Sequence, residues 1–279
     1  MPELGKTGLA LRVGIFMITG ILTLQLVSVL LNWSGLLVQA AMAVFASAAV
    51  ANGLALRIYE RGGLSNIGLG WRAGSSKNLG IGLLGGLLSA LAVTGLPVLM
   101  GLATVTKDQS RPFNLPSFIF VLAVMVFGAV GEEMLFHGYA FQLLMRKLGA
   151  FQTLLPIGVL FAAAHTNNIS ADWMSFFNTF LWGVFLGLCF LRSGDLWLPI
   201  GVHLGWNWAL PLLGANVSGF KMATTGLMLT WNIGPIWSGG DYGPEAGLLT
   251  TLVLPVLGWC LYKAPIDTTR PDMFETTED

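Results

Sequence analysis

Long apolar runs, most of them close to the length of a bilayer-spanning helix, occupy the greater part of this chain of 279 residues. A helix rises about 1.5 Å per residue, so about 20 apolar residues cross the hydrocarbon core of a bilayer. The runs predict an all-α fold, a polytopic membrane helix bundle of about eight transmembrane helices. The predicted spans are residues 9–31, 35–56, 79–103, 117–144, 153–164, 174–191, 196–213 and 248–262.

The segments between and around these runs give no sign of a soluble domain. Only 10% of the residues are charged, against about 25% in soluble domains. We therefore expect residues 1–279 to form a single integral-membrane domain, with residues 264–279 as a polar, disordered cytoplasmic tail. Glycine and proline interrupt the amphipathic stretch 222–236 and its continuation, which predicts a re-entrant or interfacial loop there.

Basic residues are distributed unevenly over the loops, and this predicts the orientation of the chain. With the N-terminus inside, 11 of the 14 Lys and Arg residues face the cytoplasm. The three on the opposite side are Lys107, Arg111 and Lys221. We expect a multi-pass protein of a prokaryotic cytoplasmic membrane with both termini in the cytoplasm. The formal net charge is zero, so the expected surroundings are the lipid bilayer, with no nucleic acid partner.

Two adjacent carboxylates, Glu132 and Glu133, lie in the middle of the run 117–144. A carboxylate in hydrocarbon costs roughly 2.5 to above 10 kcal/mol, so an intramembrane carboxylate indicates a functional site by default. The chain has three histidines, His137, His165 and His203, and they fall on or beside the predicted spans 117–144, 153–164 and 196–213. This concentration of ionisable groups is the most specific signal in the sequence.

The spacing of these residues predicts which of them share a helix face. Phe161 and His165 are four residues apart, and so are His203 and Asn207, so the members of each pair lie on one face. The polar ends of His203 and Asn207 can therefore converge on one point. A lone buried histidine is often only a packing residue, but the concentration on three spans favours a site.

The two carboxylates are expected to do different work. Glu133 and His137 are four residues apart and can pair on their own helix, which is compatible with a purely structural role. Glu132 lies about 100° around the helix from Glu133 and faces other neighbours. Cys189 and Cys260 lie in apolar runs, which indicates neither a disulfide framework nor a thiolate metal site.

Three motifs together resemble those of the CPBP intramembrane proteases, the CaaX-protease and bacteriocin-processing family that includes type II CaaX prenyl endopeptidases. They are Glu132-Glu133-x-x-x-His137, Phe161-x-x-x-His165 and His203-x-x-x-Asn207. The family patterns read EExxxR, FxxxH and HxxxN/D, in this order and on apolar segments. The resemblance covers residues 117–213, the expected catalytic core, and it departs from the family pattern where His137 replaces the usual Arg.

The resemblance implies that the chain is an endopeptidase that hydrolyses a peptide bond of a membrane-associated protein or peptide. By position, Glu132 and His165 would activate a water molecule, and His203 and Asn207 would bind the oxyanion. The supporting residues would be Glu133, His137 and Phe161. The chemistry agrees, because amide hydrolysis needs a base for water and donors aimed at the tetrahedral oxygen. Whether the substrate is prenylated stays open.

Several alternatives remain at this stage. Members of the family are also described as metalloproteases, so a zinc-dependent version is one alternative to a mechanism without a cofactor. The H-E-x-x-H motif of many zinc proteases is absent from the sequence, and Asn207 is a poor zinc ligand. A non-catalytic membrane scaffold or immunity factor and a proton-coupled transporter are others, although no inverted repeat favours a transporter. The motifs of site-2, presenilin-like and rhomboid proteases are absent.

Overall fold

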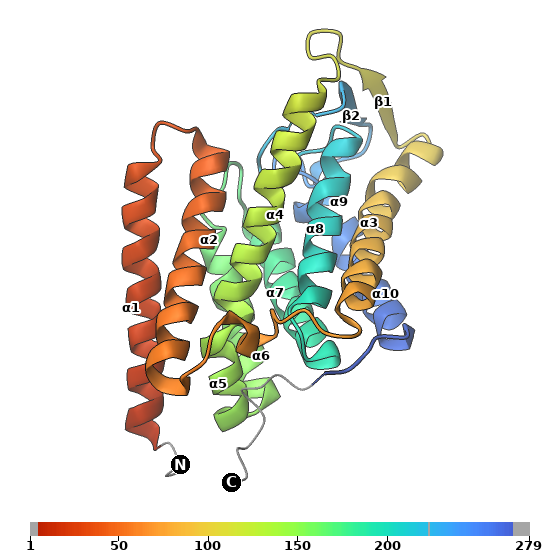
Figure 1. Ribbon diagram of the computed structural model, residues 1–279. Helices are drawn as coiled ribbons and strands as arrows, with labels where there is room; N and C mark the ends of the chain where they lie inside the picture. The colour runs from red at the N-terminus through yellow and green to blue at the C-terminus, as the bar shows by residue number, and fades with distance from the viewer. Residues whose placement is uncertain (1–4, 223, 270–279) are drawn as a thin grey trace.

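The computed structural model describes residues 5–222 and 224–269, which form a bundle of helices with a small β-ribbon at one end (Figure 1). The prediction of an all-α membrane bundle is confirmed. The long helices are α1 (Lys6–Leu30), α2 (Leu36–Ala55), α3 (Ser75–Leu99), α4 (Leu115–His137), α5 (Tyr139–Leu148), α6 (Ala150–Ala164), α7 (Trp173–Ser193), α8 (Trp197–Leu212) and α10 (Leu248–Lys263). The short elements are η1 (Leu56–Glu60), η2 (Leu64–Ile67), α9 (Pro235–Ser238), η3 (Pro244–Ala246), β1 (Ala103–Lys107) and β2 (Leu227–Trp231).

Five helical segments of the described chain are long and apolar enough to cross a membrane, so the chain is a multi-pass membrane protein. Their bounds are Lys6–Leu30, Leu36–Glu60, Ser75–Leu99, Leu115–Leu148 and Trp173–Ser193. Large apolar side chains cover the outward faces, as a lipid environment requires; Leu22 and Leu26 of α1 are each 60% exposed. Helices α6, α8 and α10 are shorter, so the number of eight spans stays a prediction.

The run 117–144, predicted as one span, is broken into α4 and α5 at Gly138. The side chain of Asn52, from α2, is the reason. Its amide donates to the carbonyl of Met134 at 2.9 Å, and its oxygen accepts from the backbone N–H of Tyr139 at 2.7 Å. These bonds satisfy backbone groups that the break would otherwise leave unpaired. A partner from another helix therefore holds the break that ends α4 at His137.

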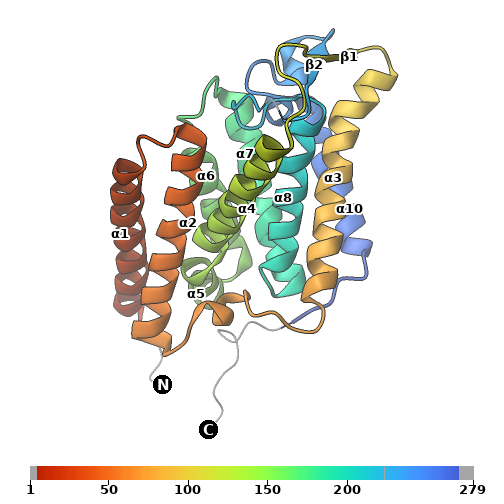
Figure 2. The same cartoon turned by 45° about the horizontal axis from the view of Figure 1, so that its top comes forward.

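The stretch 222–236 was predicted to be a loop, and this is wrong for its centre. Strand β2 pairs antiparallel with β1, in register from Ala103 opposite Trp231 to Lys107 opposite Leu227. The β-branched residues Thr104, Val105, Thr106 and Thr230 suit this pairing, but the two strands are more than a hundred residues apart in sequence. The ribbon lies at the end of the bundle opposite the two termini (Figures 1 and 2).

The first residues of the predicted disordered tail are docked, which corrects that prediction for residues 264–269. Asp267 pairs with Lys77 at 2.7 Å, and its backbone N–H donates to the side chain of Asn78 at 3.0 Å. The N–H of Thr269 donates to the carbonyl of Ser193 at 2.7 Å. Residues 270–279 lie outside the described chain.

Glycines bring α3 and α8 into close backbone contact. Gly82 and Gly86 on α3 face Gly201 and Gly205 on α8, and a Cβ at any of the four would overlap the backbone of the other helix. Small residues four apart are a common device for close helix contact in membranes. This contact fixes α8, the helix that carries His203 and Asn207, at the centre of the bundle (Figure 2).

Candidate active site

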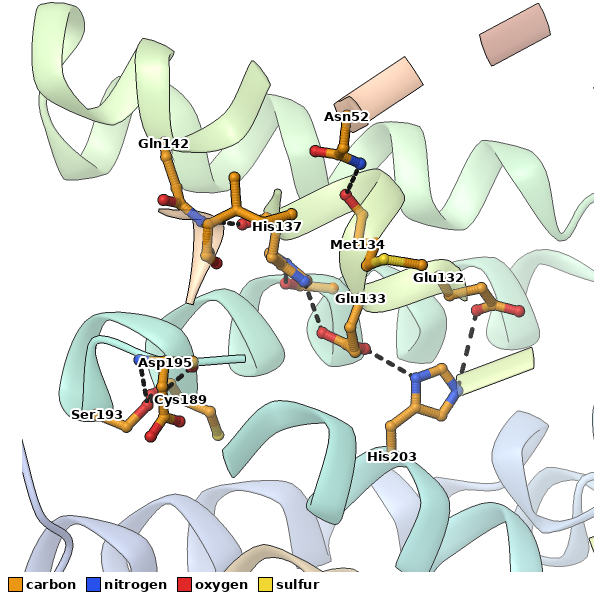
Figure 3. A network of polar contacts seen from close by, with 12 residues as sticks. Asn52, Glu132, Glu133, Met134, His137, Gln142, Cys189, Ser193, Asp195 and His203 are labelled. Atoms are coloured by element: carbon orange, nitrogen blue, oxygen red, sulfur yellow. Dashed lines mark hydrogen bonds and ion pairs between the residues drawn. The ribbon is translucent and has the colours of Figure 1, made fainter. Parts of the chain in front are cut away.

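Glu133 is fully buried on α4 and joins two histidines from different helices (Figure 3). Nδ1–H of His137 donates to its Oε2 at 2.8 Å, across one helical turn. Nδ1–H of His203, from α8, donates to its Oε1, also at 2.8 Å. The predicted pair of Glu133 and His137 is therefore present, and the carboxylate additionally orients His203.

Both ring nitrogens of His137 face acceptors. Nδ1 meets Glu133, and Nε2 lies 3.2 Å from the carbonyl oxygen of Gly183 on α7. Only the imidazolium form has an N–H on each nitrogen, so this form satisfies both contacts. The ring packs beside Gly187 of α7, where a Cβ would lie 2.5 Å from the side chain of Leu154 on α6 but at an ordinary contact distance, 3.4 Å, from Nε2 of His137. His137 thus holds the Glu133 carboxylate from the position at which the family motif has arginine.

Glu132 points away from Glu133, toward a second pair of ring nitrogens. Its Oε2 lies 3.6 Å from Nε2 of His165 and 3.9 Å from Nε2 of His203. This oxygen is buried and has no hydrogen-bond partner within the part of the chain that the structure describes. The predicted divergence of the two carboxylates is confirmed, and Glu132 is the one that can bond to a substrate or water atom.

His165 caps the C-terminus of α6, and its ring is held from one side. Nδ1–H donates to the carbonyl oxygen of Phe161 at 2.7 Å, so Nε2 is left to face Glu132. The Phe161 ring lies 4.9 Å from the His165 ring and 5.0 Å from that of Phe136, centre to centre. Phe161 therefore supports His165 both through its backbone and through its side chain.

A cavity of about 290 Å³ joins these side chains to the apolar residues of α2 and α4. Asn207, one turn beyond His203 on α8, lines this cavity, so the structure brings together the four predicted catalytic residues. Of the residues that the sequence analysis assigned to the site, five line the cavity: Glu132, Phe161, His165, His203 and Asn207. Glu133 and His137 lie behind the cavity wall, fully buried.

The cavity also contains a carboxylate that sequence reasoning missed, Glu245 of η3. Its Oε1 accepts from the indole N–H of Trp206 at 3.2 Å, and its Oε2 accepts from the hydroxyl of Ser218 at 2.9 Å and from the backbone N–H of Ser218. Burial raises the pKa of this carboxyl above its ordinary value. Glu245 lies in a loop without a motif, and a search of apolar spans cannot find it.

A comparison with protein families places the site in a known context. The family model described as type II CAAX prenyl endopeptidase Rce1-like matches residues 114–209. The chain contains an Rce1-like segment. This segment begins at Asn114, the N-cap of α4, and ends in α8, so it includes all three motifs, and the resemblance drawn from them is confirmed. The Rce1-like family implies a protease with a peptide or protein substrate in a membrane. A search of curated proteins gave no match.

Metal binding by the Rce1-like segment would require a suitable set of ligands. Zinc in proteins is held by three or four Cys, His, Asp or Glu side chains at about 2.0–2.3 Å. Among the residues that the structure describes, no group of three or more such side chains is arranged to hold a metal ion. Nδ1 of His203 is bonded to Glu133 and Nδ1 of His165 to the Phe161 carbonyl, and the Nε2 atoms of both rings face Glu132. Nδ1 bonds of this kind also orient metal-binding histidines, so they do not decide between the two mechanisms.

Proposed function

We propose that this chain is a glutamate-dependent intramembrane endopeptidase in which Glu132 is the general base. The observation that carries the proposal is the position of the Glu132 Oε2 oxygen, buried and facing the Nε2 atoms of both His165 and His203. A carboxylate at the wall of a cavity, with a histidine in reach, is a suitable pair for activating water. Residues 117–213 form the catalytic core under this proposal.

In the first step, a water molecule between Glu132 and His165 gives a proton to the carboxylate. The resulting hydroxide attacks the carbonyl carbon of the scissile peptide, and the carbonyl oxygen becomes negative. When the C–N bond breaks, the proton held by Glu132 passes to the leaving nitrogen, and the products are a carboxylic acid and an amine. His165 orients the water molecule by a hydrogen bond and stabilises the negative charge of the Glu132 carboxylate.

The oxyanion is bound by His203 and the amide of Asn207. Since Nδ1–H of His203 donates to Glu133, an N–H at Nε2 requires the imidazolium form, which the Glu133 carboxylate stabilises. Donors aimed at a developing oxyanion in a cavity shielded from water contribute strongly to rate. Glu133 and His137 thus support catalysis from behind the cavity wall.

The proposed reaction needs no cofactor, and the zinc-dependent version is the alternative that a measurement must exclude. The substrate is a membrane-associated protein or peptide, because the cavity reaches apolar residues of α2 and α4. We propose a prokaryotic cytoplasmic membrane as the location, with both termini in the cytoplasm.

The proposal is tested by comparing the membrane and secreted proteomes of native-host cells that carry wild-type protein, Glu132→Ala or Glu60→Gln. Glu60 lies outside the cavity and pairs with Arg12 at 2.6 Å, so its variant controls for loss of a carboxylate. Protein fragments present with the wild type and Glu60→Gln, but missing with Glu132→Ala, support the protease. Identical fragments in all three would contradict it.

A further inference from the structure

We infer that the candidate site receives its water, and the peptide bond that it cleaves, from the membrane face opposite the two termini. This inference rests on the proposed protease function and adds the side of the membrane at which the substrate is presented. Three independent features of the structure carry it: a second cavity, a filled layer beneath the site, and the segregation of the basic residues.

The second cavity, of about 190 Å³, meets the site at His165. Its lining is rich in hydroxyl groups and includes Thr166, Ser175, Thr179 and Tyr242. His165 and Thr179 also line the first cavity, so the two cavities meet there. Burial raises the pKa of the Tyr242 phenol to about 12, so this group remains a neutral hydroxyl at physiological pH. Such a lining can conduct water to His165 and Glu132.

This polar cavity leads from the site to the end of the bundle that carries the β-ribbon. Thr166 and Asp172 at its mouth are exposed, whereas Thr179 and Tyr242 at its inner end are buried. Both mouth residues belong to the connection between α6 and α7, which lies at the end opposite the termini (Figure 2). Because α6 stops at Ala164, this connection starts directly at the catalytic histidine.

Between the site and the end of the bundle that carries the two termini, buried side chains form a packed layer. Below Glu133 lie His137, Tyr139 and Phe141, each fully buried, followed by the fully buried Ile67 of η2. The side-chain amide of Gln142 closes this layer by donating to the carbonyls of His137 at 3.0 Å and Ile67 at 2.9 Å. None of these residues lines either of the two cavities, so neither cavity continues through this layer toward the termini.

The basic residues identify which side the open end faces. The ends of α1, α3, α5, α7 and α10 on the side of the termini carry Lys6, Lys77, Arg146, Lys147, Arg192 and Lys263. Arg12 lies in the second turn of α1, and Arg57, Arg61 and Arg72 lie in or beside the short helices between α2 and α3, on the same side. Of the described basic residues, Lys107, Arg111 and Lys221 lie at the ribbon end. Because positively charged loops stay in the cytoplasm, the open end faces away from it. The substrate class is therefore a membrane-bound protein or peptide whose scissile bond lies at the extracytoplasmic side.

The test uses a Cys260→Ser background, since Cys260 is exposed and Cys189 is buried. Thr166→Cys and Ala171→Cys each place a thiol in the lining of the polar cavity, and Leu148→Cys places one at the terminal end of α5. Spheroplasts of the native host that express each variant are treated with a bulky, membrane-impermeant maleimide. Labelling and the release of Glu132-dependent fragments are measured before and after treatment, and the cleavage positions are mapped on the fragments' parent proteins.

We expect Thr166→Cys and Ala171→Cys to be labelled in intact spheroplasts, and fragment release to fall to the level of Glu132→Gln cells. Leu148→Cys should be labelled only after the membrane is opened. Mapped cleavage positions should fall on the extracytoplasmic side of apolar segments. Labelling of the cavity thiols only after opening, unchanged release after their modification, or cytoplasmic cleavage positions would each overturn the inference. If wild-type and Glu132→Gln cells released the same fragments, the protease function itself would fail, which is a distinct result.

Discussion

Glu133 Oε1 accepts a hydrogen bond from Nδ1–H of His203 at 2.8 Å, and the two residues are separated by 70 positions in the chain. The other ring nitrogen of His203 faces Glu132, the residue next to Glu133. Two adjacent carboxylates thus act on one imidazole from its two sides. Glu133 orients the ring, and in the proposed mechanism it also stabilises the imidazolium form, while Glu132 lines the cavity in which the reaction would take place.

Replacement of Glu133 by glutamine should lower stability more than it lowers turnover. The amide keeps the shape of the side chain but loses the carboxylate that accepts from His137 and His203, and removing one partner of a buried pair costs about 3–5 kcal/mol. We expect a lower melting temperature in detergent with partial cleavage retained. Glu60→Gln, at a partly exposed pair, is the control, for which about 0.2–1 kcal/mol is expected. An inactive Glu133→Gln protein of unchanged stability would show that the roles of the two carboxylates are reversed.

Removal of the amide of Asn207 should affect rate without affecting the fold. Loss of one oxyanion donor typically lowers kcat by about 10²–10³-fold. We expect a loss of this size for Asn207→Ala, with the melting temperature unchanged because the side chain lines a cavity. Asn232→Ala removes an exposed amide at the ribbon end and should cleave like the wild type. Wild-type turnover by Asn207→Ala would exclude it from the oxyanion site.

Glu245 should make stability depend on pH in a defined direction. Burial raises its pKa above 4.5, so the folded state favours the protonated carboxyl. Its contribution is greatest below the ordinary carboxyl pKa and is lost as pH rises through the raised value. We expect the melting temperature of Glu245→Gln to change less over this interval than that of the wild type. Asp241→Asn, at an exposed position in the same loop, is the control, and equal pH profiles for Glu245→Gln and wild type would refute the assignment.

Metal content tests the choice between the two protease mechanisms. We expect less than one zinc per chain in protein purified without a nickel column, and little effect of chelators on cleavage. The reason is that Glu132 and His165 suffice to take the proton from water, and Asn207 is a poor zinc ligand. One zinc per chain that is lost together with activity, and that restores activity when added back, would establish the zinc-dependent version.

The parts of the fold that depend on neighbouring residues could be predicted from the sequence. Apolar run length predicts the helices, and the spacing of four residues predicts that Glu133 meets His137 and that His165 lies beside Phe161. The motif order also predicts that His203 and Asn207 share a site with Glu132. These relations follow from helix geometry or from the family resemblance.

The remaining features depend on contacts between distant segments. Asn52 of α2 holds the break at Gly138, and the sequence does not single out this glycine from Gly128 and Gly131, which lie within α4. Strand β1 pairs with β2, which follows only after the five helices α4–α8. Glu245 becomes buried because Trp206 and Ser218 donate to it, and neither is near it in sequence. Tertiary structure decides each of these, so local patterns carry no signal for them.

The most direct test of the account is the cleavage of a substrate found in the proteome comparison by purified protein reconstituted in lipid. Wild type, Glu132→Gln and Glu60→Gln are compared, with the melting temperature of each measured in parallel. General-base catalysis contributes about 10²–10⁴-fold, so Glu132→Gln should lose activity by at least this factor while it melts like the wild type. A folded Glu132→Gln protein that cleaves the substrate at the wild-type rate would contradict the claim that Glu132 activates the water.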